Sequence, residues 1–199
     1  MTRWARLGEH TVRVEVPTGV TVEAALAGVA QVPGVVEAWA GEAHVAVVTA
    51  APWPDGDAVA AAVTAAGPTP AGTAPKVHRV PVRYDGVDLA EVAERLGLSA
   101  EAVVARHAGA YRVGVVGFAP GFAYLGPLPP ALRLPRRATP RPRVPAGAVA
   151  IAGDRTAVYP GGTGGGWWIL GQALDFAPFD PARGAVLAVG DHVHFEVAR

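Results

Sequence analysis

The side chains of this sequence best suited to chemistry are arginines gathered in one short stretch, ALRLPRRATPRPRVPAG. No aspartate or glutamate occurs between residues 102 and 153. Interleaved prolines favour a stiff, extended backbone, and guanidinium groups held on it suit bidentate recognition of a carboxylate or phosphate. The alternative is a solvated basic loop that pairs with acidic residues elsewhere. The arginines are Arg133, Arg136, Arg137, Arg141 and Arg143.

Other reactive side chains are scarce. The 199 residues contain no cysteine, one serine (Ser99) and one lysine (Lys76). A thiol nucleophile, a disulfide framework and a cysteine-ligated metal are therefore excluded. Ser99 stands where a helix cap is expected, and Lys76 falls in a predicted linker, so neither is an attractive nucleophile. We expect the chain to act by positioning, arginine electrostatics and proton transfer, and to supply part of a site.

Two glycine-rich motifs flank the arginines. In VGFAPGFAYLGPL, glycines punctuate three aromatic residues, a pattern typical of a packed corner or of a backbone that approaches a ligand closely. In YPGGTGGGWWIL, the glycines lack the Gly-Lys-Ser/Thr ending of a phosphate-binding loop and precede a strand, so we interpret them as a mobile hairpin loop. Trp167 and Trp168 must face opposite sides of that strand, which favours exposure of one ring as a partner anchor.

Neither a metal nor a nucleic acid is predicted as a ligand. His192 and His194 share one face of a strand, but Asp191 points the other way and no cysteine completes a ligand set. The segment DLAEVAERLGLSAEAVVARHAG has a helix-turn-helix rhythm, yet its second helix offers only Arg106 and His107 to base edges. We expect this helical pair to cover one end of a barrel.

The first 84 residues predict a compact α/β unit. Period-two alternation predicts strands, and capping residues followed by apolar positions at helical spacing predict helices. The resulting order, β-α-β-β-α-β, is the ferredoxin-like pattern. Its elements are strand 10–16, helix 21–31, strands 35–40 and 44–49, a helix capped by Asp55 or Asp57 that ends near residue 66, and strand 77–84, which follows a Pro/Gly/Thr linker.

The remainder, residues 85–199, begins with helices over 88–96 and 99–108 and then changes character. From Tyr111 onward, short strands alternate with Gly/Pro turns, which indicates a β-barrel or sandwich-like domain. The net charge is zero, which argues against a general polyanion binder. No apolar stretch approaches the ~20 residues of a membrane span. We therefore expect a soluble cytoplasmic protein.

Several of these motifs, taken in order, resemble one known family. VGFAPGFAYLG, LPRRATPRPRVPAGAVAIAG, DRTAVYP and GGGWWILG are similar to the 5-oxoprolinase B subunit family, also described as allophanate hydrolase subunit 1-like or Kip-type histidine-kinase inhibitors. The resemblance covers roughly residues 77 to 197. It implies a ferredoxin-like N-terminal domain, residues 1–84, and a cyclophilin-like β-barrel domain, residues 85–199.

The resemblance also implies a function. Members pair with a C subunit (allophanate hydrolase subunit 2-like) and an A subunit in an ATP-dependent 5-oxoprolinase, which opens 5-oxo-L-proline to L-glutamate. The chain would be a non-autonomous hydrolase subunit, with ATP bound in the assembled complex. Two alternatives stay open: inhibition of a sensor histidine kinase by a regulatory binding module, and a carboxyltransferase-like role in a urea carboxylase or allophanate hydrolase system. Prolyl isomerisation follows from fold analogy alone.

The family motifs further imply which residues form the site. Arg136, Arg137 and Arg141 match the P-R-x-x-T-P-R segment, and Thr156 and Tyr159 match the T-x-x-Y-P element. We assign these five to substrate or anion binding and expect Phe122 and Trp168 at a partner interface. The sequence identifies no catalytic residue.

Overall fold

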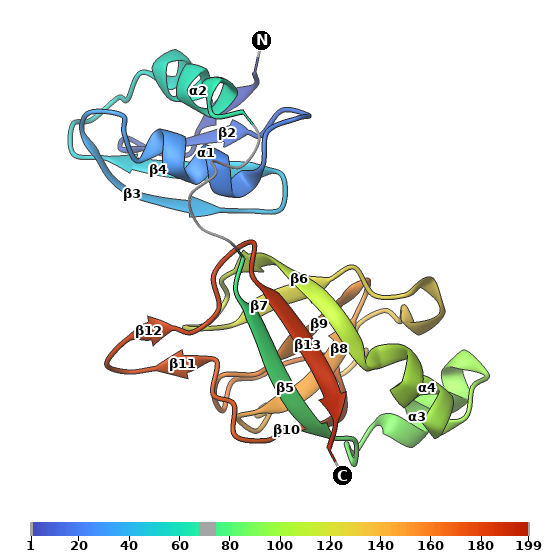
Figure 1. Ribbon diagram of the computed structural model, residues 1–199. Helices are drawn as coiled ribbons and strands as arrows, with labels where there is room; N and C mark the ends of the chain where they lie inside the picture. Colours follow the sequence, from blue (N-terminus) through green and yellow to red (C-terminus); the bar gives the residue numbers. More distant parts are fainter. Residues whose placement is uncertain (1, 68–74, 199) are drawn as a thin grey trace. The chain divides into compact units, whose positions relative to one another are not determined.

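The computed structural model describes residues 2–67 and 75–198 (Figure 1). The chain forms two compact units that divide between Ala74 and Pro75. The predicted Pro/Gly/Thr linker lies mainly outside the described residues. Each unit has its own hydrophobic core.

The N-terminal unit is a four-stranded antiparallel sheet with two helices packed on one face. The sheet order is β1-β2-β4-β3. Thr21 and Asp55 cap the two helices through their side chains, as predicted. Alternating valines of β2 and β4 meet apolar residues of both helices in one core. The elements are β1 (Trp4–Arg6), β2 (Thr11–Glu15), α1 (Val22–Val29), β3 (Val35–Ala40), β4 (His44–Thr49) and α2 (Gly56–Ala65).

The ferredoxin-like prediction is not confirmed, because its last strand belongs elsewhere. The segment predicted as strand 77–84 is strand β5 (Val77–Arg83), and it pairs with two strands of the second unit. Beside β2, the sheet edge is occupied instead by β1, a three-residue strand that the sequence did not predict. The unit boundary accordingly precedes β5, whereas the prediction placed it after residue 84.

The second unit is a closed barrel of seven strands, which confirms the predicted β-barrel architecture. Its order is β10-β5-β13-β6-β7-β9-β8, with β8 and β10 closing the ring. Strands β5 and β13, the first and last of the unit, run parallel side by side (Figure 1). The further strands are β6 (Gly109–Val116), β7 (Ala123–Gly126), β8 (Ala148–Ala152), β9 (Arg155–Val158), β10 (Trp168–Ala173) and β13 (His192–Val197), and a hairpin of β11 (Phe179–Asp180) and β12 (Gly184–Ala185) projects from the barrel.

Strand alternation divides the barrel residues between two cores. Val149, Ile151 and Val158 point into the barrel, whereas their neighbours Ala150 and Ala157 point outward. The outward residues form a second apolar cluster with Ile169 of β10 and with aromatic residues from β7 and the adjoining loops. This outer cluster underlies the candidate site.

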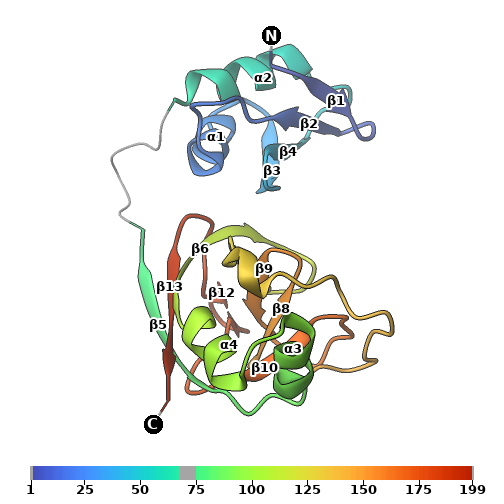
Figure 2. The same cartoon turned by 90° about the vertical axis from the view of Figure 1, so that its right-hand side faces the viewer.

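Two short helices pack against the barrel, as predicted. These are α3 (Leu89–Leu96) and α4 (Ala100–His107), joined through left-handed Gly97; a 3-10 turn, η1 (Pro130–Leu132), contacts α4. Figure 2 shows both helices in front of the barrel strands, and α3 contacts β10. Val92 and Val103 lie in the barrel core, and His107 is fully buried. His107 therefore cannot reach a DNA groove.

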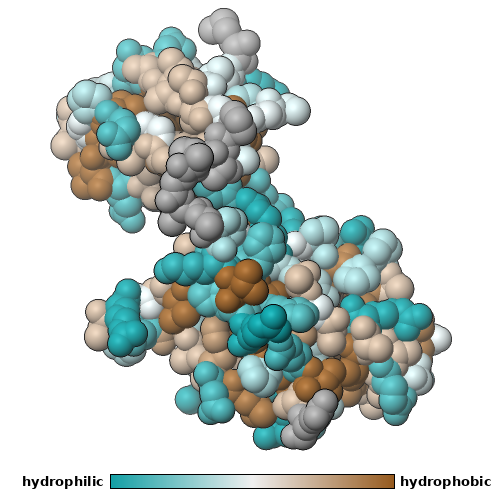
Figure 3. Space-filling model, viewed as in Figure 1, coloured by the Kyte–Doolittle hydropathy of each residue, from teal (hydrophilic) through white to brown (hydrophobic). Residues whose placement is uncertain are grey.

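On the face drawn in Figure 3, hydrophilic residues are interspersed with hydrophobic ones on both units. Within residues 2–67 and 75–198, no helix is long and apolar enough to cross a membrane.

Candidate functional site

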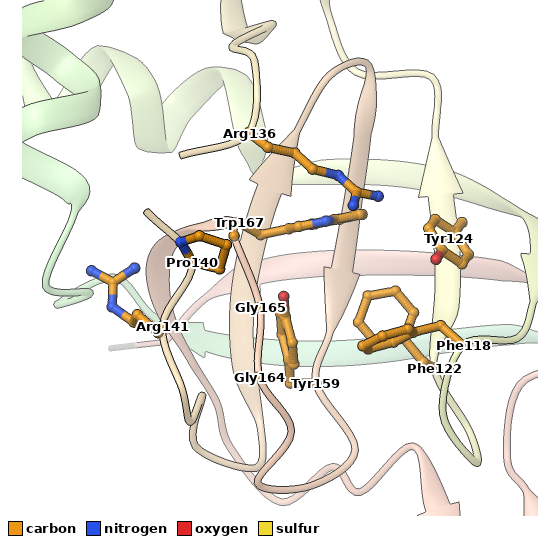
Figure 4. Close-up of a pocket in the computed structure, with 11 residues that line it drawn as sticks. Phe118, Phe122, Tyr124, Arg136, Pro140, Arg141, Tyr159, Gly164, Gly165 and Trp167 are labelled. Atoms are coloured by element: carbon orange, nitrogen blue, oxygen red, sulfur yellow. The ribbon is translucent and has the colours of Figure 1, made fainter. Parts of the chain in front are cut away.

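A cavity of about 270 Å³ lies over the outer apolar cluster of the barrel. Aromatic rings line one side of it, and the arginine-rich segment and the glycine-rich loop line the other (Figure 4). The motifs that carried the family resemblance therefore meet at one place. The lining residues are Phe118, Phe122, Tyr124, Arg136, Pro140, Arg141, Tyr159, Gly164, Gly165, Gly166 and Trp167.

Phe122 is the centre of the aromatic side. Its ring makes edge-to-face contacts with Phe118, Tyr124, Tyr159 and Trp167, at centroid distances of 5.0 to 5.5 Å. Phe118 is 67% exposed and has a φ of 74°, a left-handed conformation that is unfavourable for a bulky residue. An exposed ring held in a strained backbone at a cavity is typical of a functional position.

Arg136 is the arginine of the cavity whose positive charge is not neutralised by a carboxylate of the described residues. Its side chain extends over Trp167 toward Tyr124 (Figure 4). It forms no ion pair with any residue in the described ranges, so its guanidinium group can receive an external anion. This placement agrees with the anion-binding role expected for Arg136.

Arg137 and Arg141 are bound within the chain instead. Arg137 Nη1 lies 3.0 Å and Arg141 Nη2 2.6 Å from Oδ1 of Asp88, whose side chain is 3% exposed. Arg141 also lines the cavity, but its guanidinium group points away from the rings (Figure 4). For these two arginines the structure supports the alternative reading, in which the basic segment pairs with an acidic residue elsewhere.

Tyr159 contributes a protonated hydroxyl group to the cavity. Burial raises its pKa to about 12, although nearby Arg136 and Arg141 act in the opposite direction. A phenol with this pKa keeps its proton at neutral pH and can donate a hydrogen bond to a ligand. It is therefore unsuited to act as a general base.

Thr156 does not reach the cavity, which corrects its assignment to the anion site. It lies on β9 with its side chain toward the barrel interior, whereas Tyr159 faces the outer cluster. Thr156 donates to the carbonyl of Ala150 at 3.1 Å, so it must accept from His107 Nε2 at 2.8 Å. Tyr84 then donates to His107 Nδ1 at 2.8 Å. This buried chain is a structural network in the barrel.

Phe122 and Trp168, which we expected at a partner interface, are both buried within the unit, so Trp168 is not the exposed anchor that strand alternation favoured. Phe122 is 1% and Trp168 4% exposed. Trp168 faces the barrel core, donates from Nε1 to the carbonyl of Pro135 at 2.8 Å, and lies beneath the guanidinium groups of Arg95 and Arg137, each 4.9 Å from its ring centroid. The two tryptophans do face opposite sides of the strand, but packing covers both.

The glycine-rich loop is held by backbone pairing, contrary to its interpretation as a mobile hairpin loop. Arg141 and Gly165 exchange both backbone hydrogen bonds, at 2.8 and 3.0 Å, and Arg137 N–H donates to Gly166 at 2.8 Å. A side chain at residue 165 would collide with the Tyr159 hydroxyl. The glycines therefore allow a loop, an extended segment and a tyrosine to meet closely.

Among the residues that the structure describes, none supplies the cavity with a nucleophile or a carboxylate. Ser99 caps α4 by accepting from the Ala102 amide, and Lys76 lies at the start of β5; neither lines the cavity. In the part of the chain that the structure describes, no three His, Asp or Glu side chains come together as metal ligands. The cavity can hold a small ligand, but its own side chains offer little bond-breaking chemistry.

The structural roles of three residues in the barrel unit could not be recognised from the sequence. In the sequence Asp88 is only the first residue of the predicted helix 88–96, and it lies 49 and 53 residues from its arginine partners. His107 appears only as a candidate DNA contact. The strained backbone of Phe118 left no signal other than its place in a glycine-aromatic motif.

The closed barrel and the α/β unit that precedes it in the sequence correspond to a known domain class. The chain matches the family model "Carboxyltransferase domain, subdomain C and D" over residues 2–188 and belongs to this family. The names of its curated relatives indicate a narrower group within this family. The 5-oxoprolinase B subunit of Escherichia coli O157:H7 is 49% identical over 122 residues, and that of Bacillus subtilis 43% over 126 residues. These matches confirm the predicted 5-oxoprolinase B subunit family.

The match to the curated relatives spans little more than half of their length. The matched region covers 58% of this chain and 56% of the E. coli relative, and 60% and 52% for the B. subtilis relative. A crystal structure of TTHA0988 aligns with a TM-score of 0.80 and 40% identity, over 100% of this chain and 41% of that one. The Kluyveromyces lactis urea carboxylase shares the fold at 14% identity, with a TM-score of 0.68 over 100% of this chain and 22% of its own.

Proposed function

We propose that this chain is the B subunit of a multi-subunit 5-oxoprolinase, which hydrolyses 5-oxo-L-proline to L-glutamate and couples this step to hydrolysis of ATP. The observation that carries the proposal is the aromatic cavity, with Arg136 as its one unpaired cation among the described residues. The names of the curated relatives support the same assignment.

The cavity suits the chemistry of this substrate. 5-Oxo-L-proline is a small five-membered lactam that carries one carboxylate. The carboxylate would bind Arg136 by charge-assisted hydrogen bonds, and the ring would lie against Phe122 and Trp167. The Tyr159 hydroxyl, which stays protonated, could donate to the lactam oxygen. A volume of about 270 Å³ is appropriate for a metabolite of this size.

ATP does not fit the same cavity. Its lining, within the described ranges, offers one uncompensated guanidinium group and contains no carboxylate that could hold Mg²⁺. The glycine-rich loop leads into strand β10, so it provides no helix N-terminus for phosphates. We therefore assign ATP to another part of the complex, and this chain to recognition of the cyclic amide.

Reconstitution tests the proposal. The purified chain alone should neither consume 5-oxo-L-proline nor release phosphate from ATP, whereas a mixture with the predicted A and C subunits should do both. A folded three-subunit mixture that turns over neither compound would refute the 5-oxoprolinase assignment. Full turnover by the isolated chain would refute its dependence on partners.

A further inference from the structure

Asp88 occupies a helix-capping position without capping its helix. An aspartate just before a helix usually accepts hydrogen bonds from the first free amides. The Asp88 side chain makes no such bond to α3. Its Oδ1 accepts from Arg137 and Arg141, and its Oδ2 accepts from the backbone N–H of Ile169 at 2.7 Å. The residue is 2% exposed, so its carboxylate is committed to these three donors.

The three donors belong to the two segments that form one wall of the cavity. Arg137 and Arg141 lie on either side of Pro140 in the arginine-rich segment, and Ile169 is the second residue of β10, the strand that follows the glycine-rich loop. Arg141 and Gly165 pair through their backbones. A single carboxylate therefore fastens both segments of this wall to the start of α3.

The charges make this attachment strong. Two half-buried guanidinium groups would repel each other without a counterion, and a buried amide left without an acceptor costs free energy. Two further buried nitrogens of these groups, Arg141 Nη1 and Arg137 Nε, have no hydrogen-bond partner in the described part of the chain. Asp88 is thus the main acceptor available to either group, with Glu91 a more distant partner of Arg137 at 3.7 Å.

We propose that Asp88 is a positioning residue for the cavity: its carboxylate fills a niche of two guanidinium groups and one backbone amide, and thereby sets the wall opposite the aromatic rings. Its relevance to ligand binding rests on the proposed function of the cavity. The two guanidinium groups and the amide of this niche bind the Asp88 carboxylate by charge-assisted hydrogen bonds. A small free carboxylate could form the same bonds if the Asp88 side chain were absent.

The test removes the Asp88 carboxylate by mutation and then supplies a free carboxylate, formate, in solution. In Asp88→Ala, the indole N–H resonance of Trp167, assigned with Trp167→Phe, should shift because the wall beside it moves. Added formate should bind the vacated niche and return the resonance toward its wild-type position in a saturable manner, with a rise in melting temperature. Chloride at equal ionic strength should not. A purely global effect on stability would lower the melting temperature but leave this folded-state resonance unmoved.

Two control variants complete the experiment. Asp88→Asn nearly keeps the side-chain shape, so it should shift the resonance while leaving no room for formate to reverse the change. Asp85→Ala removes an exposed carboxylate that pairs with Arg83, and should affect neither readout. If Asp88→Ala does not fold, the position of the Trp167 indole resonance in Asp88→Asn tests the proposal instead.

An unmoved Trp167 resonance in folded Asp88→Ala or Asp88→Asn would overturn the proposal. So would an equal response to formate in the wild-type chain or in Asp85→Ala. None of these readouts uses 5-oxo-L-proline or the other subunits. Failure of the positioning role is thereby distinguished from failure of the proposed enzyme activity.

Discussion

Arg136, Arg137 and Arg141 are close in sequence but have different partners. Two of them share the carboxylate of Asp88, and the third faces the cavity without a counterion in the described part of the chain. A guanidinium group that already has an internal carboxylate gains little from a second anion, because its field is largely neutralised. We therefore propose Arg136 alone for the anion-binding role expected of the group.

Arg136→Gln should raise the KM for 5-oxo-L-proline in the reconstituted complex about tenfold. Loss of a hydrogen bond between charged groups costs about 1.5 kcal/mol or more. The melting temperature should stay near the wild-type value, because Arg136 forms no ion pair in the described structure. Steady-state kinetics and thermal unfolding check both statements. Arg143→Gln is the matched control, since Arg143 does not line the cavity. Equal KM values for the two variants would contradict the assignment.

His107 should make the barrel sensitive to acid. Burial lowers its pKa from 6.5 to about 3, and Thr156 and Tyr84 hold it in the neutral form. The unfolded chain therefore binds the extra proton between pH 6.5 and pH 3, and this contribution to stability is lost as the pH falls through that window. We expect the free energy of unfolding to drop by about 2 kcal/mol between pH 7.5 and pH 5 from this residue.

Denaturant unfolding at several pH values measures this slope, with His107→Gln as the comparison. The variant should be less stable at pH 7.5 but should lose less stability on acidification. A slope identical to that of the wild-type chain would show that His107 does not cause it.

The arginine-rich segment and the glycine-rich loop act as one element in the fold. Neither belongs to the seven barrel strands, but they pair with each other and pack against Tyr159. The glycines are required at specific points of this contact: a Cβ at residue 165 would meet the tyrosine hydroxyl, whereas a Cβ at residue 161 would have no atom within 4 Å. Close approach, more than loop flexibility, explains the glycine content.

Gly165→Ala should destabilise the chain by about 1 to 3 kcal/mol, the usual cost of overpacking. Gly161→Ala should have little effect. Because the hydroxyl of Tyr159 is the nearest obstacle, Gly165→Ala should cost less in a Tyr159→Phe background. Chemical denaturation of the wild-type chain, the two single variants and the double variant forms a double-mutant cycle. A strictly additive cycle would contradict this contact.

At the scale of the whole chain, β5 decides where the second unit begins. It lies between β10 and β13 in the barrel, so a cut after residue 84 removes one of the seven strands and opens the ring. A cut before residue 75 leaves all seven strands and both associated cores together. A boundary before residue 75 and a boundary after residue 84 therefore make opposite predictions about which isolated C-terminal fragment folds.

The fragment 75–199 should fold with cooperative thermal unfolding and dispersed amide resonances, whereas 85–199 should not. Loss of a central strand exposes the backbone edges of β10 and β13 and removes the core residues Val80 and Val82. Circular dichroism and NMR spectra of the two fragments check this. If the 85–199 fragment folds, the second domain begins after residue 84, as the sequence predicted.

The sequence by itself determined what depends on neighbouring residues. Period-two alternation, capping residues and glycine stops placed the strands 35–40 and 44–49, helices α3 and α4, and the change to a β-rich barrel, and ordered motifs identified the family. The near absence of nucleophiles could also be read from the sequence, and so could two of the residues that line the cavity, Arg136 and Tyr159.

Only the tertiary structure decided which distant residues meet. Asp88 lies 49 residues from Arg137, β5 joins the barrel by pairing with the last strand of the chain, and packing covers Trp168. Alternation alone puts Thr156 and Tyr159, three residues apart, on opposite faces, but only the closed barrel shows that Thr156 is the one facing inward. Local patterns encode periodicity and capping, whereas the partner of a buried charge and the edge on which a strand pairs are set by contacts between segments far apart in sequence.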